Sequence, residues 1–258
     1  MTRPVPRSRK VPRRPSASSS HVGLGQIDAR GRPTPKNRLL LQLQSETRDM
    51  LLHEADYVAL PLGRTFARVG DAITAAYFPD SGLLSFISEM TTGHQIVVDA
   101  VGAEGLIGLG ALLGMRHYPY SSVTLVPSHG YLVRADRLLQ VFGGSEELRR
   151  STLAYVGRRM SELVVAAACN RVHSHRQRLA RWLLVATDKA QQRSLPVTHD
   201  VLAQMVGGPR HAVTVALNQL RTKGAIAYRR GFIDVLNRST LVEQACECYD
   251  APAPVALR

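Results

Sequence analysis

The chain has 258 residues, of which 45% are hydrophobic and 21% are charged, so it is long enough for about two domains with cores of their own. It has no run of about 20 apolar residues and no signal-peptide core, so we expect neither a membrane span nor secretion. Three cysteines cannot form a disulfide framework or a four-cysteine iron–sulfur site within one chain, and we expect a reducing compartment, the cytoplasm.

Charge is distributed unevenly along the sequence. Residues 1–36 hold nine basic residues and one acidic residue, residues 37–170 are close to neutral, and residues 171–240 carry a net charge of +9. A basic, compact region predicts a polyanionic partner, with nucleic acid as the first candidate. Only four of the 33 basic residues are lysine. Arginine suits bidentate contacts to phosphate and guanine, although codon bias in a G+C-rich genome explains the excess equally well.

Residues 1–36 are predicted to be a disordered basic arm. They contain six prolines and a serine-rich tract, and they have almost no large apolar residues. The composition is also that of an organelle presequence, but the prolines would break the amphipathic helix that such a presequence needs. An arm that adds nonspecific DNA affinity and an inert tail both remain open.

Residues 37–143 are predicted to form a β-rich domain. A helical pattern over residues 37–55 comes first, and a short helix over residues 135–142 ends the region. Between them, short strands separated by Gly and Pro-Asp turns predict a compact antiparallel sandwich or barrel. The predicted strands are Tyr57–Leu62, Thr65–Val69, Ala75–Phe78, Gly82–Ser88, Gln95–Val101, Ser122–Val126 and Tyr131–Arg134.

A long helix follows a Gly143-Gly144 break and spans the predicted dimerisation region, residues 144–170. Ser145 is a good N-cap, and two glutamates follow in the first turn, where the helix dipole favours anions. Apolar residues then recur with spacings of 3, 4, 3 and 4, which predicts a coiled-coil seam between two copies of the chain. Packing on the chain's own β domain is the alternative. The residues of this seam stripe are Leu153, Val156, Met160, Leu163 and Ala167.

Residues 171–258 are predicted to be a winged helix-turn-helix domain. After a helix over residues 176–190, Thr198 caps a short helix, and Gly207-Gly208 makes a turn that needs positive φ. A second helix over residues 209–223 has a buried apolar face and a polar outer face. Two strands, Ile226–Arg229 and Phe232–Val235, then form a hairpin with arginines at its tip.

The polar face of this second helix predicts contacts to double-stranded DNA. The major groove admits one α-helix, whose outward side chains meet base edges. Arg210 can bind guanine through two hydrogen bonds, Asn218 can bind adenine or the backbone, and the hairpin arginines can hold phosphates. The predicted DNA-binding residues are Thr198, Arg210, His211, Thr214, Asn218, Arg221, Arg229 and Arg230. A plain helical hairpin with a solvated basic face is the alternative.

Residues 37–250 resemble the Crp/Fnr family of bacterial transcription regulators in the order of their elements and in local motifs. The motifs are Tyr77-Phe78-Pro79-Asp80-Ser81-Gly82, Gly102-Ala103-Glu104-Gly105-Leu106-Ile107-Gly108, Cys169-Asn170-Arg171-Val172-His173, Gln177-Arg178-Leu179-Ala180-Arg181-Trp182-Leu183 and Ala245-Cys246-Glu247-Cys248-Tyr249. The resemblance implies an α+β fold with an antiparallel, cyclic-nucleotide-binding-like β-roll, a dimer helix and a winged helix-turn-helix. It also implies a homodimer on a two-fold symmetric site, with an unknown small-molecule effector and RNA polymerase as candidate partners.

The sequence departs from the cyclic-AMP-binding members at two positions. Leu109 stands where their phosphate-binding segment has a glutamate, and Tyr120 stands where it has an arginine. Without that arginine, a buried cyclic phosphate lacks its main countercharge, so we do not expect cyclic AMP to bind. The second helix also departs, because it starts Pro209-Arg210-His211 and has Val215 at a common arginine position of the family.

Other candidate sites are interpreted as structural. His173-x-His175 has a cupin-like spacing but no acidic third ligand nearby, and Cys246-x-Cys248 has no evident partner motif, so we expect an ordinary reduced pair. Cys169 is assigned to packing. We therefore expect no metal site, no cofactor and no catalytic residues.

Two other classes of function are alternatives to a DNA-binding regulator. One is a small-molecule or metal enzyme on a cupin-like β-roll with an accessory helical domain, and it lacks a metal triad. The other is a cyclic-nucleotide sensor that acts through protein contacts alone, for which the basic C-terminal region would have no purpose.

Overall fold

Two short helices begin the described part of the chain, which comprises residues 31–229 and 231–250 of a computed structural model. Helices α1 (Arg38–Leu41) and α2 (Ser45–Leu52) replace the single helix expected over residues 37–55. Asn37 caps α1 by accepting from the amides of Leu39 and Leu40, and its side-chain amide donates to the carbonyls of Pro79 and Gly105. The predicted basic arm lies mostly outside the described residues.

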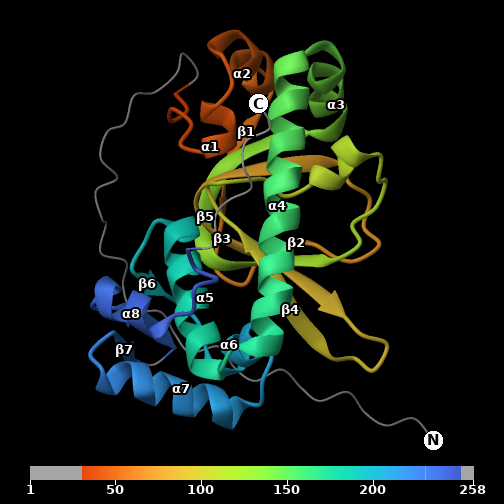
Figure 1. Ribbon diagram of the computed structural model, residues 1–258. Helices are drawn as coiled ribbons and strands as arrows, with labels where there is room; N and C mark the ends of the chain where they lie inside the picture. Colours follow the sequence, from red (N-terminus) through yellow and green to blue (C-terminus); the bar gives the residue numbers. More distant parts are fainter. Residues whose placement is uncertain (1–30, 230, 251–258) are drawn as a thin grey trace, which may run out of the picture. The chain divides into compact units, whose positions relative to one another are not determined.

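An antiparallel sheet forms the centre of the β-rich region (Figure 1). Its strands follow the order β1-β5-β3-β4, and β2 also pairs with β5. A 3-10 helix, η1 (Leu109–Leu113), lies between β4 and β5. The strands are β1 (Asp56–Leu60), β2 (Thr65–Ala67), β3 (Ala75–Glu89), β4 (Gln95–Val101) and β5 (Ser121–Arg134).

Strands β3 and β5 are each longer than the sequence indicated, because each joins two predicted strands. Pro79-Asp80 was expected to be a turn, but it lies inside β3, where the register with β5 shifts at bulges. Glycines allow this close crossing, since a Cβ on Gly82 would lie 2.3 Å from the carbonyl oxygen of Pro127, and one on Gly130 would lie 2.2 Å from that of Phe78. The bulges bend the paired strands without ending them.

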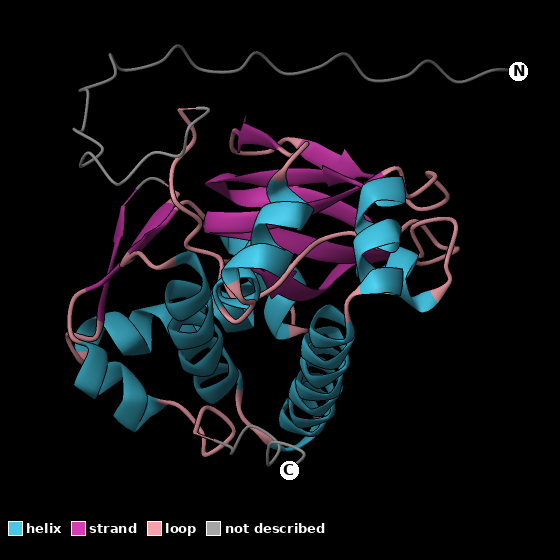
Figure 2. Ribbon diagram, turned by 90° about the horizontal axis from the view of Figure 1, so that it is seen from above, coloured by secondary structure: helices cyan, strands magenta, loops and turns pink. Residues whose placement is uncertain are grey.

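Helix α3 (Ala135–Gly144) leads directly into α4 (Glu146–Val172). The predicted break at Gly143-Gly144 is wrong, since both glycines belong to α3 and only Ser145 separates the two helices. The Ser145 side chain accepts from the amide of Leu148, as expected of an N-cap. In Figure 1, α4 runs past the strands from the end where α2 and α3 lie to the end where α6 lies, and Figure 2 shows the same helix beside the sheet.

The C-terminal region contains the predicted helix pair and hairpin, with two further elements. Strand β6 joins the hairpin in the order β6-β8-β7, and α8 follows it. The sequence prediction missed both, because two residues of β6 and a short helix of mixed pattern give little periodicity. The elements are α5 (His175–Ala190), β6 (Ser194–Leu195), α6 (His199–Val206), α7 (Arg210–Thr222), β7 (Ile226–Arg229), β8 (Phe232–Val235) and α8 (Arg238–Gln244).

One apolar core joins the C-terminal helices to the sheet. Leu83 of β3 and Val97 of β4 are buried in the same cluster as Leu179 and Leu183 of α5 and Met205 of α6. From Pro35 onward the chain is therefore one compact unit, in which the C-terminal region rests on the β domain. Among the described helices, none is both long and apolar enough to cross a membrane.

Candidate nucleic-acid interface

A tight turn connects α6 to α7. Gly207 ends α6 with a φ of 65°, which glycine adopts without steric cost. Gly208 lies directly against α5, because a Cβ on Gly208 would lie 2.2 Å from Nε2 of His175. Burial, aided by Arg178 and His211, lowers the pKa of His175, so its ring is held in the neutral form. The turn thus has both the backbone and the packing that a helix-turn-helix requires.

Helix α7 has the two faces that its sequence predicts. Val213, Ala216, Leu217 and Leu220 are buried in the same apolar core as residues of α5, α6 and the hairpin sheet. The outward positions carry polar side chains and one apolar side chain, Val215, which is 55% exposed. The exposed outward residues are Arg210, His211, Val215, Asn218 and Arg221.

Arg210, at the first position of α7, is 68% exposed and oriented by a neighbour. Its Nε lies 3.3 Å from a carboxylate oxygen of Asp200 on α6, which leaves the end of the guanidinium facing outward as a donor pair. Thr214 was predicted to be a DNA contact on the outer face of α7, but it is half-buried. Its hydroxyl donates to the carbonyl of Arg210 and lies 3.2 Å from Nδ1 of His199.

Thr198, at the start of α6, and Arg229, at the end of β7, are two of the predicted phosphate contacts outside α7. The Thr198 hydroxyl caps α6 by accepting from the amide of Val201, so its own proton can still be donated outward. The Arg229 side chain is 79% exposed at the end of β7, with Asp234 3.4 Å away. Arg230, predicted beside it, lies outside the described residues.

Tyr120, which stands in the sequence where the cyclic-AMP-binding members have an arginine, lies among aromatic side chains. Tyr120 packs on Phe86 with ring centroids 4.4 Å apart and on Tyr118 at 6.1 Å. Burial raises the pKa of Tyr120 to about 12, so this hydroxyl stays neutral. Leu109 is half-buried and packs on the core under α2 and α3. Both departures from the cyclic-AMP-binding pattern are therefore built into apolar packing.

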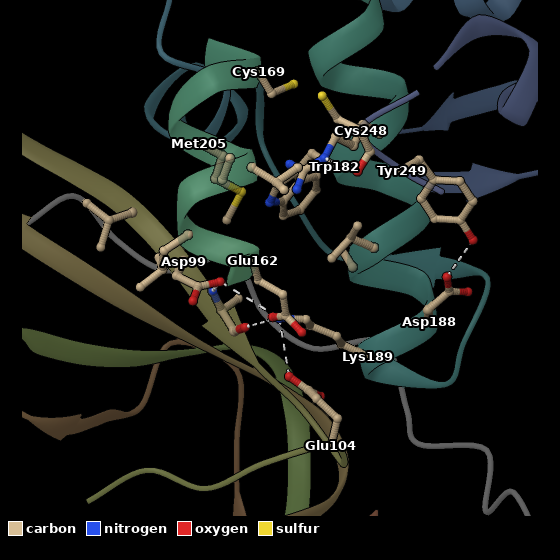
Figure 3. Close-up of a pocket in the computed structure, with 18 of the residues that line it drawn as sticks. Asp99, Glu104, Glu162, Cys169, Trp182, Asp188, Lys189, Met205, Cys248 and Tyr249 are labelled. Atoms are coloured by element: carbon tan, nitrogen blue, oxygen red, sulfur yellow. Dashed lines mark hydrogen bonds and ion pairs between the residues drawn. The ribbon is translucent and has the colours of Figure 1, made fainter. Parts of the chain in front are cut away.

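A cavity of about 490 Å³ lies between β4, α4 and α5 (Figure 3). One side of it is lined by a charged group that we call the junction network. Lys189 of α5 lies 3.3 Å from Glu104, 3.5 Å from Glu162 and 3.8 Å from Asp99, and Arg159 pairs with the last two. Burial lowers the pKa of Lys189 against the opposing effect of the carboxylates. The network joins three parts of the fold: the β domain, α4 and α5.

Helix α4 has two separate stripes. Leu148, Thr152, Tyr155 and Arg159 are buried toward the β domain. The seam stripe lies on another face, where Leu153 is 61% exposed, Met160 63% and Leu163 45%. Val156, between them, is half-buried, so among the described residues Leu153, Met160 and Leu163 are the large side chains of the seam stripe that remain uncovered.

The structure also brings together residues that the sequence prediction kept apart. Cys169, His173, Cys246 and Cys248 meet at the C-terminal end of α4. His175, by contrast, turns toward Gly208, so the two histidines of the His-x-His pair do not act together. The sequence spacing Cys169-x3-His173, which places both side chains on one helical face, was the observation that could have indicated this cluster.

Comparisons with known proteins agree with this architecture. Residues 177–244 match the family model of the Crp-like helix-turn-helix domain. No curated protein matches the sequence. Among solved structures, FixK2 from Bradyrhizobium japonicum gives a TM-score of 0.63 at 15% identity, over 74% of this chain and 98% of that one.

Two further solved structures are similar over their whole length. The c-di-GMP-responsive global regulator CLP from Xanthomonas campestris gives a TM-score of 0.61 at 18% identity, over 75% of this chain and 100% of that one. A CRP-family transcriptional regulator from Thermus thermophilus gives 0.61 at 19% identity, over 78% and 100%. The predicted α+β fold and the expected Crp/Fnr resemblance are confirmed, and none of these findings supports the cupin-like enzyme.

Proposed function

We propose that this chain, a Crp/Fnr-type DNA-binding transcription regulator by its fold and its helix-turn-helix domain, binds a two-fold symmetric DNA site as a homodimer. The observation that carries the proposal is the outer face of α7. Its exposed Arg210, His211, Asn218 and Arg221 stand opposite a fully buried apolar face. That face fits the major groove, and the net charge of the region fits the phosphates on either side.

Each predicted residue has a distinct role in this proposal. Arg210, oriented by Asp200, donates two hydrogen bonds to O6 and N7 of guanine. His211 and Asn218 contact neighbouring bases or sugars, and Val215 packs on a thymine methyl group. Thr214 faces the DNA with its methyl group, because its hydroxyl is bonded within the protein. Thr198, Arg221 and the hairpin arginines hold phosphates and fix the position of the domain on the duplex.

The seam stripe supports the homodimer. An apolar stripe of Leu153, Met160, Leu163 and the adjoining Val164 would be exposed along α4 in an isolated chain. Such a continuous patch is costly in water, and a second copy of α4 covers it with matched spacing. The two-fold axis between the two α4 helices then relates two copies of α7, and each copy can contact one half-site of the DNA.

The proposal assigns the protein a binding role and no catalysis. Partners are double-stranded DNA, a second copy of the chain, RNA polymerase and a small-molecule effector that is not cyclic AMP. The apolar packing of Leu109 and Tyr120 argues against a ligand with a cyclic phosphate in the β-roll. The cavity beside the junction network lies where an effector would reach β4, α4 and α5 together.

The test is selection of bound sequences from a random duplex pool by the full-length protein. We expect one motif with two inverted half-sites, enriched in a salt-sensitive manner. If only unrelated sequences are recovered, and only at low salt, the protein binds polyanions without sequence preference and the proposal is refuted.

A further inference from the structure

All three cysteines of the chain and one histidine converge at one point. Cys169 is in the last turn of α4 and His173 caps that helix, while Cys246 and Cys248 lie in the segment after α8. One ligand atom from each residue lies within 4.8 Å of the others. Figure 3 shows the sulfur atoms of Cys169 and Cys248 pointing toward each other. We call these four residues the thiol–imidazole cluster.

Two distances in the cluster match those between ligands of one metal ion and are longer than a disulfide bond. Sγ of Cys169 lies 3.5 Å from Sγ of Cys246, and Sγ of Cys248 lies 3.7 Å from Nδ1 of His173. A disulfide requires about 2.05 Å between sulfur atoms. Tetrahedral zinc with bonds of about 2.3 Å to sulfur and about 2.0 Å to nitrogen separates its ligand atoms by roughly 3.5–3.8 Å. A [4Fe–4S] cluster would hold the sulfurs farther apart, because each cysteine binds a different iron.

The histidine is oriented as a ligand. Its Nε2 lies 3.1 Å from a carboxylate oxygen of Glu247, the residue between the two C-terminal cysteines. Because a carboxylate only accepts, Nε2 is the donor in this contact, which leaves Nδ1 as the ring atom that faces the sulfurs. In many zinc sites, the ring nitrogen of the histidine that does not bind the metal donates a hydrogen bond to a carboxylate, as Nε2 of His173 does to Glu247 here.

Local backbone structure holds the four side chains in place. His173 follows the last residue of α4, and its amide donates to the carbonyl of Cys169, so the end of the helix holds the two residues near each other. The amide of Tyr249 donates to the carbonyl of Cys246, which folds the C-terminal segment into a turn. Arg181 donates to the carbonyl of Cys248 and places a cation beside the thiols.

We propose that the thiol–imidazole cluster binds one structural Zn²⁺ through Cys169, His173, Cys246 and Cys248. Binding replaces three S–H protons with the metal, so three thiolates and a neutral imidazole give the site a net charge of −1, beside Arg181. Four protein ligands leave no open position, which is the arrangement of structural and not catalytic zinc. Cys169 and Cys246 are buried, at 1% and 6% exposure, and the site is closed to solvent on that side.

Zinc at this point ties the end of α4 to the C-terminal segment that follows α8. The metal therefore fixes the helix-turn-helix region to the helix that we assign to the dimer, next to the α4–α5 connection. The site itself does not depend on the proposed DNA function, since it is defined by ligand atoms alone.

The test is the metal content of the full-length protein, purified under reducing conditions without an affinity tag. We expect elemental mass spectrometry of the purified protein to find one zinc ion per chain. Cobalt replacing it should give the charge-transfer and d–d absorption of a tetrahedral thiolate site. Cys246→Ser and His173→Ala should lose the metal, while His94→Ala, which changes an exposed histidine in the β3–β4 turn, should keep it.

A second variant tests the geometry without removing a ligand. Glu247→Gln weakens the partner of His173, and we expect zinc affinity to fall by about 10- to 100-fold in competition with a chelator. Reduced wild-type protein that holds no zinc and gives no tetrahedral cobalt spectrum would overturn the proposal, whatever the variants do. A Cys169–Cys246 disulfide in the purified protein would also overturn it, in favour of a redox pair. Failure to bind DNA while the metal stays in place would count against the proposed function and not against this site.

Discussion

Lys189 and Glu104 face each other 3.3 Å apart, although one ends α5 and the other follows β4. The main chains meet at the same place, since the amide of Ala103 donates to the carbonyl of Lys189. A Cβ on Gly102 would lie 2.2 Å from that carbonyl oxygen. The lysine also donates to the carbonyl of Ala100. The end of α5 is therefore attached to the β domain by charge and by backbone.

Lys189→Met should destabilise the fold by about 3–5 kcal/mol, because it leaves the buried Glu104 without its cation, while Glu162 keeps Arg159. Urea unfolding at neutral pH measures the change in the free energy of unfolding. Arg150→Ala is the matched control, since its pair with Glu146 is exposed on α4 and is worth about 1 kcal/mol or less. Equal small effects for both variants would mean that the junction network contributes little to stability.

The junction network should also weaken in acid. Burial works to raise the pKa of Glu162, but Lys189, Arg159 and Arg158 outweigh it and lower that pKa below its ordinary value of 4.5. Ionised Glu162 therefore stabilises the folded state above the ordinary value, and this contribution is lost as pH falls through the lower, folded value. Wild type should be more stable than Glu162→Gln at pH 7, and the difference should close in acid. A difference independent of pH would contradict this.

Arg210→Ala should weaken binding to the selected DNA site by about 1–3 kcal/mol per half-site and relax the preference at one base pair. Fluorescence anisotropy with the selected duplex, and with variants of each base pair, measures both effects. If affinity falls equally for all sequences, Arg210 contacts phosphate and not a base.

Arg229→Ala should weaken binding to all sequences alike, because the hairpin contacts only the backbone. The slope of log K against log salt should become shallower by about one unit for each phosphate that the variant no longer neutralises. Titrations at several salt concentrations give this slope. An unchanged slope would show that Arg229 does not reach the DNA.

Met160→Glu should separate the dimer into monomers at micromolar concentration. Its charge would face its own copy across the two-fold axis, where both charges lose their water without gaining a partner. Ala154→Glu, at an exposed position of α4 outside the seam stripe, is the control and should remain dimeric. Sedimentation of both variants decides the matter, and a dimeric Met160→Glu would place the interface elsewhere.

The local parts of the fold could be predicted from the sequence because their determinants are adjacent in the chain. Ser145 and Thr198 cap their helices, Gly207 takes the positive φ of the turn, and the hairpin strands have the predicted bounds. The joining of β3 across Pro79-Asp80 could not be predicted, since it depends on Gly130, far along the chain.

The site residues divide in the same way. The two faces of α7 follow from helical spacing alone. The thiol–imidazole cluster does not, because Cys169 and Cys246 are 77 residues apart and only the return of the chain after α8 joins them. Lys189, Glu104 and Glu162 carry charges typical of a surface, so only the structure shows that they meet between the β domain and two helices. The same limit applies to Thr214, whose hydroxyl turns toward His199.

Gly208 packs the α6–α7 turn closely on His175, in the first turn of α5. Only His173 and Ser174 separate α4 from α5, so a rotation at that short connection would have to break the junction network, and it would then carry α5, α6 and α7 together. In the proposed dimer, a signal from the β domain would then change the distance between the two copies of α7. The structure of each helix-turn-helix would stay the same. The response of the protein would then be a change in the spacing of the two copies of α7.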